Sequence, residues 1–265
     1  MTAGVAAADV ALSGDAWMGL DYERGRTNEI QMMSRARVSF TLSGETDSGL
    51  AFGAGFRADN AGDAVGGTAG SVFISGEFGR LALGDVDSAV AATTFRTRHV
   101  GNLEAGGGSR TTAGLGAGTL PAALYTYSME GFTVALGASQ IASGGQQVSV
   151  GGSYSMGGFG VAVGYETIQG GANLTAVSGQ ASFDDVTVRA AFVRHSVLGD
   201  EISADVNASF DGIGVQLRVK QDYDSNNHIG AGVTYGLGGG ATMGAGVNRV
   251  EGGDTTARVG LNFSF

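Results

Sequence analysis

Apolar and polar residues alternate along this chain in one segment after another, each of about ten to thirteen residues. The last nine residues, 257–265, are ARVGLNFSF and keep the alternation to the end. Side chains of a β-strand point in turn to the two faces of a sheet, so this pattern predicts strands with one apolar face. Helical spacing of apolar residues is nearly absent. The chain is therefore expected to be all-β.

The connections between the segments predict the number of strands. Short turns are expected at seven places and longer connections at eight, which together join sixteen strands. An even number of strands leaves both termini at one end, where the first strand, about residues 9–22, can pair with the last. That pairing closes the sheet and removes its open edges. The short turns are expected at 44–48, 76–79, 130–131, 157–158, 184–185, 211–212 and 238–240, and the longer connections at 23–28, 60–69, 88–119, 141–146, 168–172, 197–200, 223–227 and 250–254.

The second face of the strands distinguishes a membrane barrel from a soluble sandwich. A soluble sheet would carry many charges there, but only 15% of the residues are charged and 49 of 265 are glycine. Small and polar residues with scattered Arg and Asp occupy this face, as in a water-filled lumen. Bacterial membrane barrels have strands of about 9–11 residues, apolar outside and polar inside, with short turns at one end and longer loops at the other. The sequence predicts one domain, residues 1–265, folded as a 16-stranded antiparallel transmembrane β-barrel.

Composition excludes several other classes of protein. The formal net charge of −10 argues against a nucleic-acid partner, which needs a basic surface. The absence of cysteine excludes disulfides and thiolate metal sites. No run approaches the roughly 18 consecutive apolar residues that a transmembrane helix needs. Residues 1–8 are expected to be the remnant of a signal peptide or a frayed terminus, because small residues precede Asp9 as they precede a cleavage site.

Alternation also places ionisable side chains inside the expected barrel. Arg35, Arg37 and Arg57 fall on the inner face of neighbouring strands, where three guanidinium groups repel one another unless a counter-charge faces them. Trp17 is expected to point inward as well. Elsewhere on the inner wall, cations are expected to pair with acids, the candidates being Arg189, Arg218, Lys220, Arg258, Asp205, Glu166 and Asp222.

Four segments, taken in order with the sixteen strands, resemble a known family. They are SRARVSF at 34–40, GLAFGAGFRADN at 49–60, FGRLALGDVDSA at 78–89 and the terminal GLNFSF. The chain resembles the general diffusion porins of Gram-negative outer membranes, most closely the alphaproteobacterial, Rhodobacter-like type. The resemblance covers essentially the whole chain. It implies a channel for passive diffusion of ions and small hydrophilic solutes, surrounded by outer-membrane lipid and usually assembled as a homotrimer.

The resemblance further implies a constriction. In this family the third external loop folds into the lumen and narrows it, and here that loop is 88–119. The wall arginines fall where the family has its basic cluster, and acids of the loop are expected to face them and create a transverse field. The loop also carries arginines, so its charge is mixed and the ion preference stays open. The expected constriction residues are Arg35, Arg37, Arg57, Asp85, Asp87, Arg96, Arg98 and Glu104.

The end of the chain acquires a role from the same resemblance. In such barrels the last strand, ending in phenylalanine, is the signal that the barrel-assembly machinery recognises. Phe265 is expected to be its key residue, supported by Phe263 and Leu261. The same resemblance implies that the connection at 60–69 contacts a neighbouring subunit and so acts as a subunit latch.

Little else in the sequence suggests chemistry. His99, His195 and His228 lie in separate segments, with no nucleophile or carboxylate at a spacing typical of a catalytic or metal site. Asp85 and Asp87 could chelate calcium, although the glycine and distal glutamate of a helix-loop-helix calcium site are missing. Apart from this structural calcium, no cofactor is expected. The alternative function is an outer-membrane barrel with an enzymatic or adhesive role.

Overall fold

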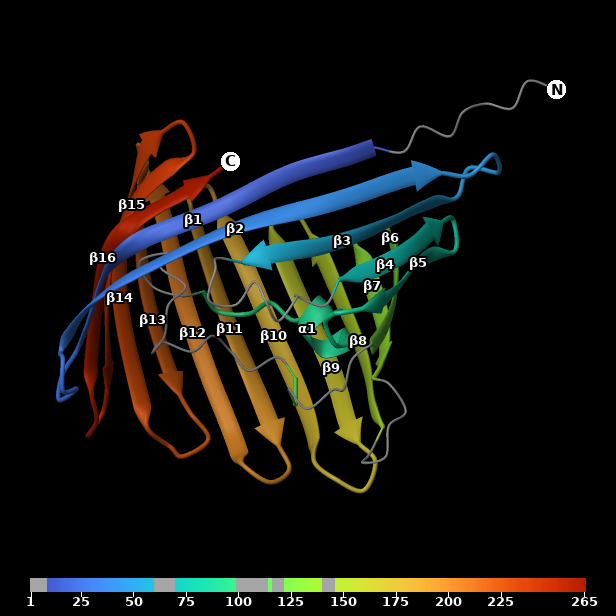
Figure 1. Ribbon diagram of the computed structural model, residues 1–265. Helices are drawn as coiled ribbons and strands as arrows, with labels where there is room; N and C mark the ends of the chain where they lie inside the picture. Colours follow the sequence, from blue (N-terminus) through green and yellow to red (C-terminus); the bar gives the residue numbers. More distant parts are fainter. Residues whose placement is uncertain (1–8, 60–69, 99–113, 116–121, 140–145) are drawn as a thin grey trace.

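The computed structural model describes residues 9–59, 70–98, 114–115, 122–139 and 146–265. These residues form sixteen strands and one short helix (Figure 1). The strands are β1 (Asp9–Glu23), β2 (Ile30–Glu45), β3 (Ala51–Asp59), β4 (Ser71–Gly76), β5 (Gly79–Gly84), β6 (Ala122–Met129), β7 (Phe132–Ala138), β8 (Gln147–Met156), β9 (Phe159–Ile168), β10 (Asn173–Phe183), β11 (Val186–His195), β12 (Gly199–Phe210), β13 (Ile213–Gln221), β14 (Asn227–Gly238), β15 (Ala241–Val250) and β16 (Thr255–Ser264), and the helix is α1 (Ala89–Thr93).

Pairing of the first strand with the last closes the barrel. Each strand pairs antiparallel with its neighbours in sequence, and β1 pairs with β16 (Figure 1). The register runs from Asp15 opposite Ser264 to Glu23 opposite Thr256. Beyond it, Gly14 N–H donates to the Phe265 carbonyl at 3.1 Å, and Phe265 N–H donates back at 2.9 Å. The predicted 16-stranded antiparallel barrel, closed by its first and last strands, is confirmed.

The short turns lie at one end of the barrel and have the predicted sequences. Asp211 and Gly212 join β12 to β13 with φ values of 46° and 80°. Glu130 and Gly131 join β6 to β7 in the same way, with φ values of 49° and 85°. Positive φ at both central positions is what the tight hairpin turn requires, which favours glycine at the second position.

In the described part of the chain, no helix has the length and apolar character needed to cross a bilayer.

The two faces of the wall differ as the alternation predicted. In β9, Val161 and Val163 are 63% and 56% exposed on the outer face, whereas Glu166 on the inner face is 0% exposed. Phe132 and Tyr154 also lie outside, next to the short turns, with ring centroids 4.2 Å apart. Exposed aliphatic residues with aromatic residues near the strand ends are typical of a wall that contacts lipid.

Glycine allows β1 and β16 to approach closely. Gly19 and Gly260 are direct partners in the register. A Cβ on Gly19 would lie 2.3 Å from the Val259 carbonyl oxygen, and one on Gly260 would lie 2.4 Å from that of Met18. No other residue fits at either position without moving the backbone. The high glycine content therefore has a structural reason at this seam.

Candidate functional site in the barrel lumen

The predicted basic cluster lies on the inner wall of β2 and β3. Arg35 and Arg37 share the inner face of β2, and Arg57 occupies the same face of β3. Asp15 Oδ2 lies 2.6 Å from Arg35 Nη2. The Asp59 carboxylate lies 3.3 Å from Arg37 Nε and 2.7 Å from Arg57 Nε. Two wall carboxylates thus supply counter-charge to all three guanidinium groups.

Sequence reasoning missed these two acids, because it sought the counter-charge in the third loop. The signal was present in the alternation, since Asp15 and Asp59 share the inward parity of the arginines. Asp59 directly opposes Arg37 in the register of β2 and β3. The Arg57 side chain remains 42% exposed to the lumen despite its ion pair. The basic wall therefore still presents charge to the interior of the barrel.

Trp17 lies beside this cluster. It is 9% exposed, and the Arg35 guanidinium carbon is 6.0 Å from its ring centroid, at the limit of a cation–π contact. The register of β1 and β2 places the two residues opposite each other. The predicted inward orientation of Trp17 is confirmed, and packing against Arg35 accounts for it.

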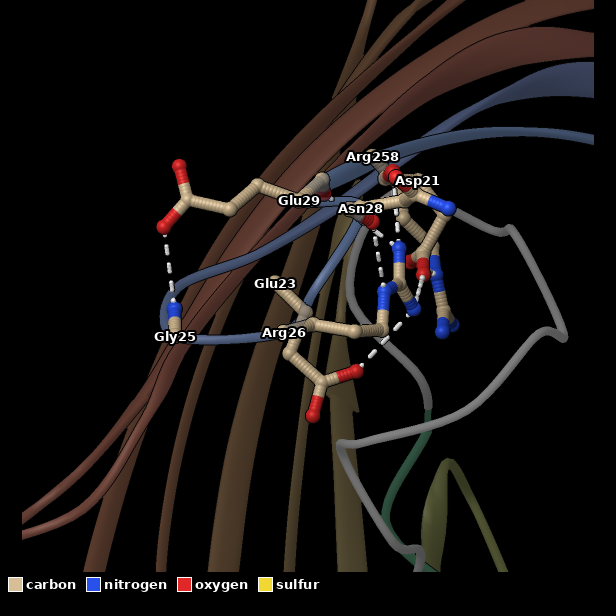
Figure 2. A network of polar contacts seen from close by, with 7 residues as sticks. All are labelled: Asp21, Glu23, Gly25, Arg26, Asn28, Glu29 and Arg258. Atoms are coloured by element: carbon tan, nitrogen blue, oxygen red, sulfur yellow. Dashed lines mark hydrogen bonds and ion pairs between the residues drawn. The ribbon is translucent and has the colours of Figure 1, made fainter.

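Asp21 is the centre of a second group of charges, at the long-loop end of β1 (Figure 2). Its carboxylate accepts hydrogen bonds from Arg258 Nε at 2.5 Å and from Arg26 Nη1 at 2.9 Å. Arg26 Nη1 also lies 3.1 Å from a carboxylate oxygen of Glu23. This group joins the connection between β1 and β2 to the last strand. The sequence suggested Asp205, Glu166 or Asp222 as the partner of Arg258. The observed partner is Asp21, so that expectation was wrong.

The described part of the third long connection lies against the inner wall. α1 begins after Ser88, whose Oγ accepts a hydrogen bond from the Ala91 N–H at 3.2 Å and so caps the helix. The helix packs on β7, β8 and β9. Because it contacts their inner faces, it lies within the ring of strands (Figure 1).

Four side chains of the inner wall accept backbone N–H groups of this connection. A buried N–H without a partner is costly, so these acceptors decide where the connection can lie. They come from β8, β9, β10 and β12, a continuous part of the wall apart from β11. Ser149 accepts from Ala89 at 2.9 Å, Glu166 from Leu115 at 2.7 Å, Ser178 from Phe95 at 2.9 Å and Asp205 from Arg98 at 2.5 Å.

Glycines on the same wall make room for the helix. A Cβ on Gly151 would lie 2.3 Å from Thr93 Oγ1, and one on Gly164 would lie 3.0 Å from a methyl carbon of Val90. Side chains at these two positions would push α1 away from the wall. Glycine at inward positions of β8 and β9 therefore permits the close approach of the connection.

An apolar cluster also holds α1. Val90 packs with Leu174 and Ala176 of β10 and with Val193 of β11, and all four are fully buried. The sequence suggested that small and polar residues fill the whole inner face. That expectation is wrong at this place, because the helix rather than water covers the wall.

Charged pairs line the inner wall of β11, β12 and β13. Arg189 Nη1 lies 3.3 Å from Asp205 Oδ1, which confirms the expected pairing of these residues. Lys220 Nζ lies 2.7 Å from Glu201 Oε2, an acid that the sequence analysis did not consider. Asp205 therefore serves both the wall and the third connection.

Arg218 of β13 and Glu166 of β9 form hydrogen bonds with side-chain amides of the inner wall. Arg218 Nη2 donates to Asn248 Oδ1 at 2.9 Å. Glu166 accepts a short hydrogen bond from the Gln147 side-chain amide in addition to that from the loop. Glu166 was expected to pair with a cation of the wall. It instead accepts hydrogen bonds from amide groups.

The remaining predicted constriction residues are spread along the connection. Asp85 and Asp87 are exposed before α1, Arg96 is half-buried after it, and Arg98 is exposed. Glu104 lies outside the described residues, as do residues 1–8 and the whole of the expected subunit latch at 60–69. The position of the loop acids opposite the basic wall therefore stays a prediction.

Metal binding rests on the sequence alone. Among the residues that the structure describes, no three His, Cys, Asp or Glu side chains come together in a group that could hold a metal ion. Calcium binding at Asp85 and Asp87 stays a prediction.

Fold and lumen together define a class of protein. The wall is a closed ring of strands with an apolar outer face, and its interior carries charged pairs and a segment of chain docked on one side. A sheet of sixteen strands is wide enough to enclose an aqueous channel. These features define an outer-membrane β-barrel channel.

The comparison with known proteins agrees. The Gram-negative porin family matches residues 1–265, and the chain belongs to that family. It is 32% identical to a porin of Rhodobacter capsulatus over 304 residues, which cover 97% of this chain and 100% of that protein. A porin structure refined at 1.8 Å resolution superposes with a TM-score of 0.83 at 30% identity, covering 97% of this chain and 100% of the other. A triple mutant of the Rhodopseudomonas blastica porin shares the fold at 22% identity, with a TM-score of 0.76 and the same coverage.

The predicted resemblance, channel function and outer-membrane location are thereby confirmed. The protein forms a porin channel that spans the outer membrane with its strands. The family is one of channels rather than enzymes.

Proposed function

We propose that solutes cross the barrel between the basic wall of β1 to β3 and the docked connection that follows β5. The connection is bound to β8, β9, β10 and β12, about half a turn around the ring from β1. The remaining passage then borders Arg35, Arg37 and Arg57. The docking of α1 on the wall opposite these arginines is the observation that carries the proposal.

The charges around this passage would make the channel selective among ions. Arg57 is exposed on one side, and Asp85 and Asp87 are exposed on the connection. Opposed charges across a narrow aqueous passage produce a transverse field that orients polar solutes and disfavours apolar ones. Because Asp15 and Asp59 partly neutralise the basic wall, we expect selectivity among ions to be moderate.

A reversal potential in a KCl gradient tests this path. Arg57→Ser should shift the potential toward cation preference, and replacing Arg35, Arg37 and Arg57 together should shift it further. Arg194→Ser is the matched control, because it removes the same charge from the outer face. A triple variant with the wild-type potential would refute the proposed path.

The porin relatives suggest that the channel is a homotrimer, and we include this in the proposal. An apolar hollow of about 640 Å³ on the seam of β1, β2, β15 and β16 offers a surface for a neighbouring subunit. Met18, Met32 and Met243 line it, and flexible methionine side chains adapt to an opposing surface. Native mass spectrometry in detergent should give three copies of the 26.5 kDa chain. A single copy under the gentlest conditions would contradict the trimer.

Recognition of the last strand by the barrel-assembly machinery is also part of the proposal. Phe265 is 80% exposed at the seam, where a receptor could reach it. Phe265→Ala should lower the fraction of chains that fold into the membrane in cells. Phe210→Ala is the control, because Phe210 is another exposed phenylalanine at the short-turn end. Equal losses in the two variants would argue against a specific signal.

A further inference from the structure

Two arginines lie on the outer face of the barrel, which is otherwise apolar. Of the Arg and Lys residues on the described strands, only Arg194 and Arg249 have the outward parity. Both stand within two residues of a strand end, on the side of the longer connections. A charge on a lipid-facing surface costs least at this level and most at the bilayer centre. The two residues therefore mark the depth of the lipid headgroups.

The two arginines differ in their partners. Arg194 binds Asp200 through two hydrogen bonds of 2.8 and 2.9 Å, and its guanidinium lies 5.5 Å from the Phe192 ring centroid. The side chain of Arg249 is exposed and makes no hydrogen bond or ion pair with any residue that the structure describes. The nearby acid Glu251 is held by the Asn227 side-chain amide at 2.5 Å. Arg249 is thus the outward cation to which the described residues offer no counter-charge.

An apolar hollow of about 710 Å³ adjoins Arg249 on the same face. Ile202, Val219 and Ile229 line it and are all more than half exposed. Val219 pairs with Ile229, and Ile229 pairs with Arg249, in the registers of three adjacent strands. The arginine therefore continues a row of aliphatic side chains. Gln221 and Asn227 form the next row toward the loops and bind each other at 3.4 Å.

We propose that Arg249 and this hollow bind a lipid that carries a phosphate group. The acyl chain would lie along Ile202, Val219 and Ile229, and the phosphate would accept hydrogen bonds from the guanidinium at headgroup depth. A planar guanidinium matches phosphate oxygens and is less strongly hydrated than an ammonium group, which favours phosphate as its partner. The apolar row distinguishes this site from a site for a soluble anion, because free phosphate has no apolar group that could contact the row. The site lies outside the lumen and is independent of the proposed path for solutes.

Native mass spectrometry of the detergent-solubilised protein can test the site. The probe is dimyristoylphosphatidic acid, and its matched partner is dimyristoylglycerol, which has the same chains and no phosphate. The wild-type protein should retain one phosphatidic acid in preference to the diacylglycerol. Arg249→Gln should weaken that binding roughly tenfold or more, as expected for the loss of a charge-assisted hydrogen bond. Arg194→Gln should leave it unchanged, although it removes the same charge at the same depth.

Each other outcome would overturn the proposal. Equal binding of the two lipids would show that the phosphate is not recognised. Selective binding that survives in Arg249→Gln would place the site elsewhere. Displacement of the lipid by millimolar inorganic phosphate would show that the apolar hollow plays no part. The conductance of Arg249→Gln should equal that of the wild type, which confirms that the variant folds into an intact channel.

Discussion

Asp21 of β1 accepts a hydrogen bond from Arg258 of β16 at 2.5 Å, although 237 positions separate them in the sequence. The side chain of Asp21 is 5% exposed, and that of Arg258 is 15% exposed. The register places the two residues directly opposite each other at the seam. Arg26 binds the same carboxylate from the first long connection (Figure 2). One acid therefore links both strands of the seam to the connection beside them.

Asp21→Asn should destabilise the barrel by about 3 kcal/mol, because it removes the carboxylate charge that Arg258 and Arg26 share in a nearly buried site. Urea unfolding followed by the fluorescence of Trp17 measures this change, and Trp17 is the only tryptophan of the chain. Asp15→Asn is the matched control. Its ion pair with Arg35 is more exposed, so it should cost less than about 1 kcal/mol. Equal losses of stability in Asp21→Asn and Asp15→Asn would show that the seam network has no special role.

Asp59 should tune the ion preference of the channel. Its carboxylate lies within ion-pair distance of both Arg37 and Arg57. Asp59→Asn removes the negative charge that both arginines share and should shift the reversal potential toward anions. Asp200→Asn removes an equal charge from the outer face and should leave the potential unchanged. A shift toward cations in Asp59→Asn would contradict the position assigned to this wall.

Glycine at position 151 should control how closely the third connection approaches the wall. Gly151→Val would place a Cβ 2.3 Å from Thr93 Oγ1 and 2.5 Å from the Ala89 carbonyl oxygen. Such overpacking should cost about 1–3 kcal/mol and displace α1 toward the passage. Single-channel conductance should then change, and the connection should become more sensitive to protease. Gly152→Val is the control, since its outward Cβ meets only the Thr133 carbonyl oxygen, at 3.8 Å.

The fold could be predicted from the sequence because alternation is local. The residues of each strand alone show which side chains belong to which face. The turns at Glu130 and Asp211 show where the chain reverses its direction. The inward parity of Arg35, Arg37 and Arg57 followed from the same pattern. The wall is a single layer of strands, so parity decides which side chains point inward, although α1 covers some of them, such as Leu174 and Val193.

Side-chain partners could not be predicted in the same way, because they depend on the register between strands. Arg258 pairs with Asp21 only because β16 and β1 meet with Gly260 opposite Gly19. Lys220 pairs with Glu201, and Glu166 binds the third connection instead of a wall cation. The four acceptors for that connection are ordinary Ser, Asp and Glu residues, which nothing in the sequence distinguishes from other inward polar residues.

Asp222, in the connection between β13 and β14, should respond to acid. Partial burial alone would raise the pKa of its carboxyl group. Hydrogen bonds with His228 Nε2 at 2.8 Å and from the Asn226 backbone N–H at 2.9 Å outweigh this effect and lower the pKa. The contribution to stability is therefore present above the unfolded value of about 3.9 and is lost as the pH falls through the folded-state pKa.

A carbon-detected NMR titration in detergent measures this pKa directly. Asp222 should titrate below about 3.9, and His228→Gln should move its pKa back toward that value. Asn227→Ala, which changes the neighbouring residue, should have a smaller effect. An Asp222 pKa that is the same in wild type and His228→Gln would contradict the role of the histidine.

The most direct test of the whole account is the current through a planar bilayer after insertion of the folded protein. A water-filled barrel should give stepwise, long-lived openings whose conductance rises in proportion to salt concentration, and Arg57→Ser should move the reversal potential toward cations. Protein with the circular dichroism of a folded barrel that inserts but carries no current would contradict the channel.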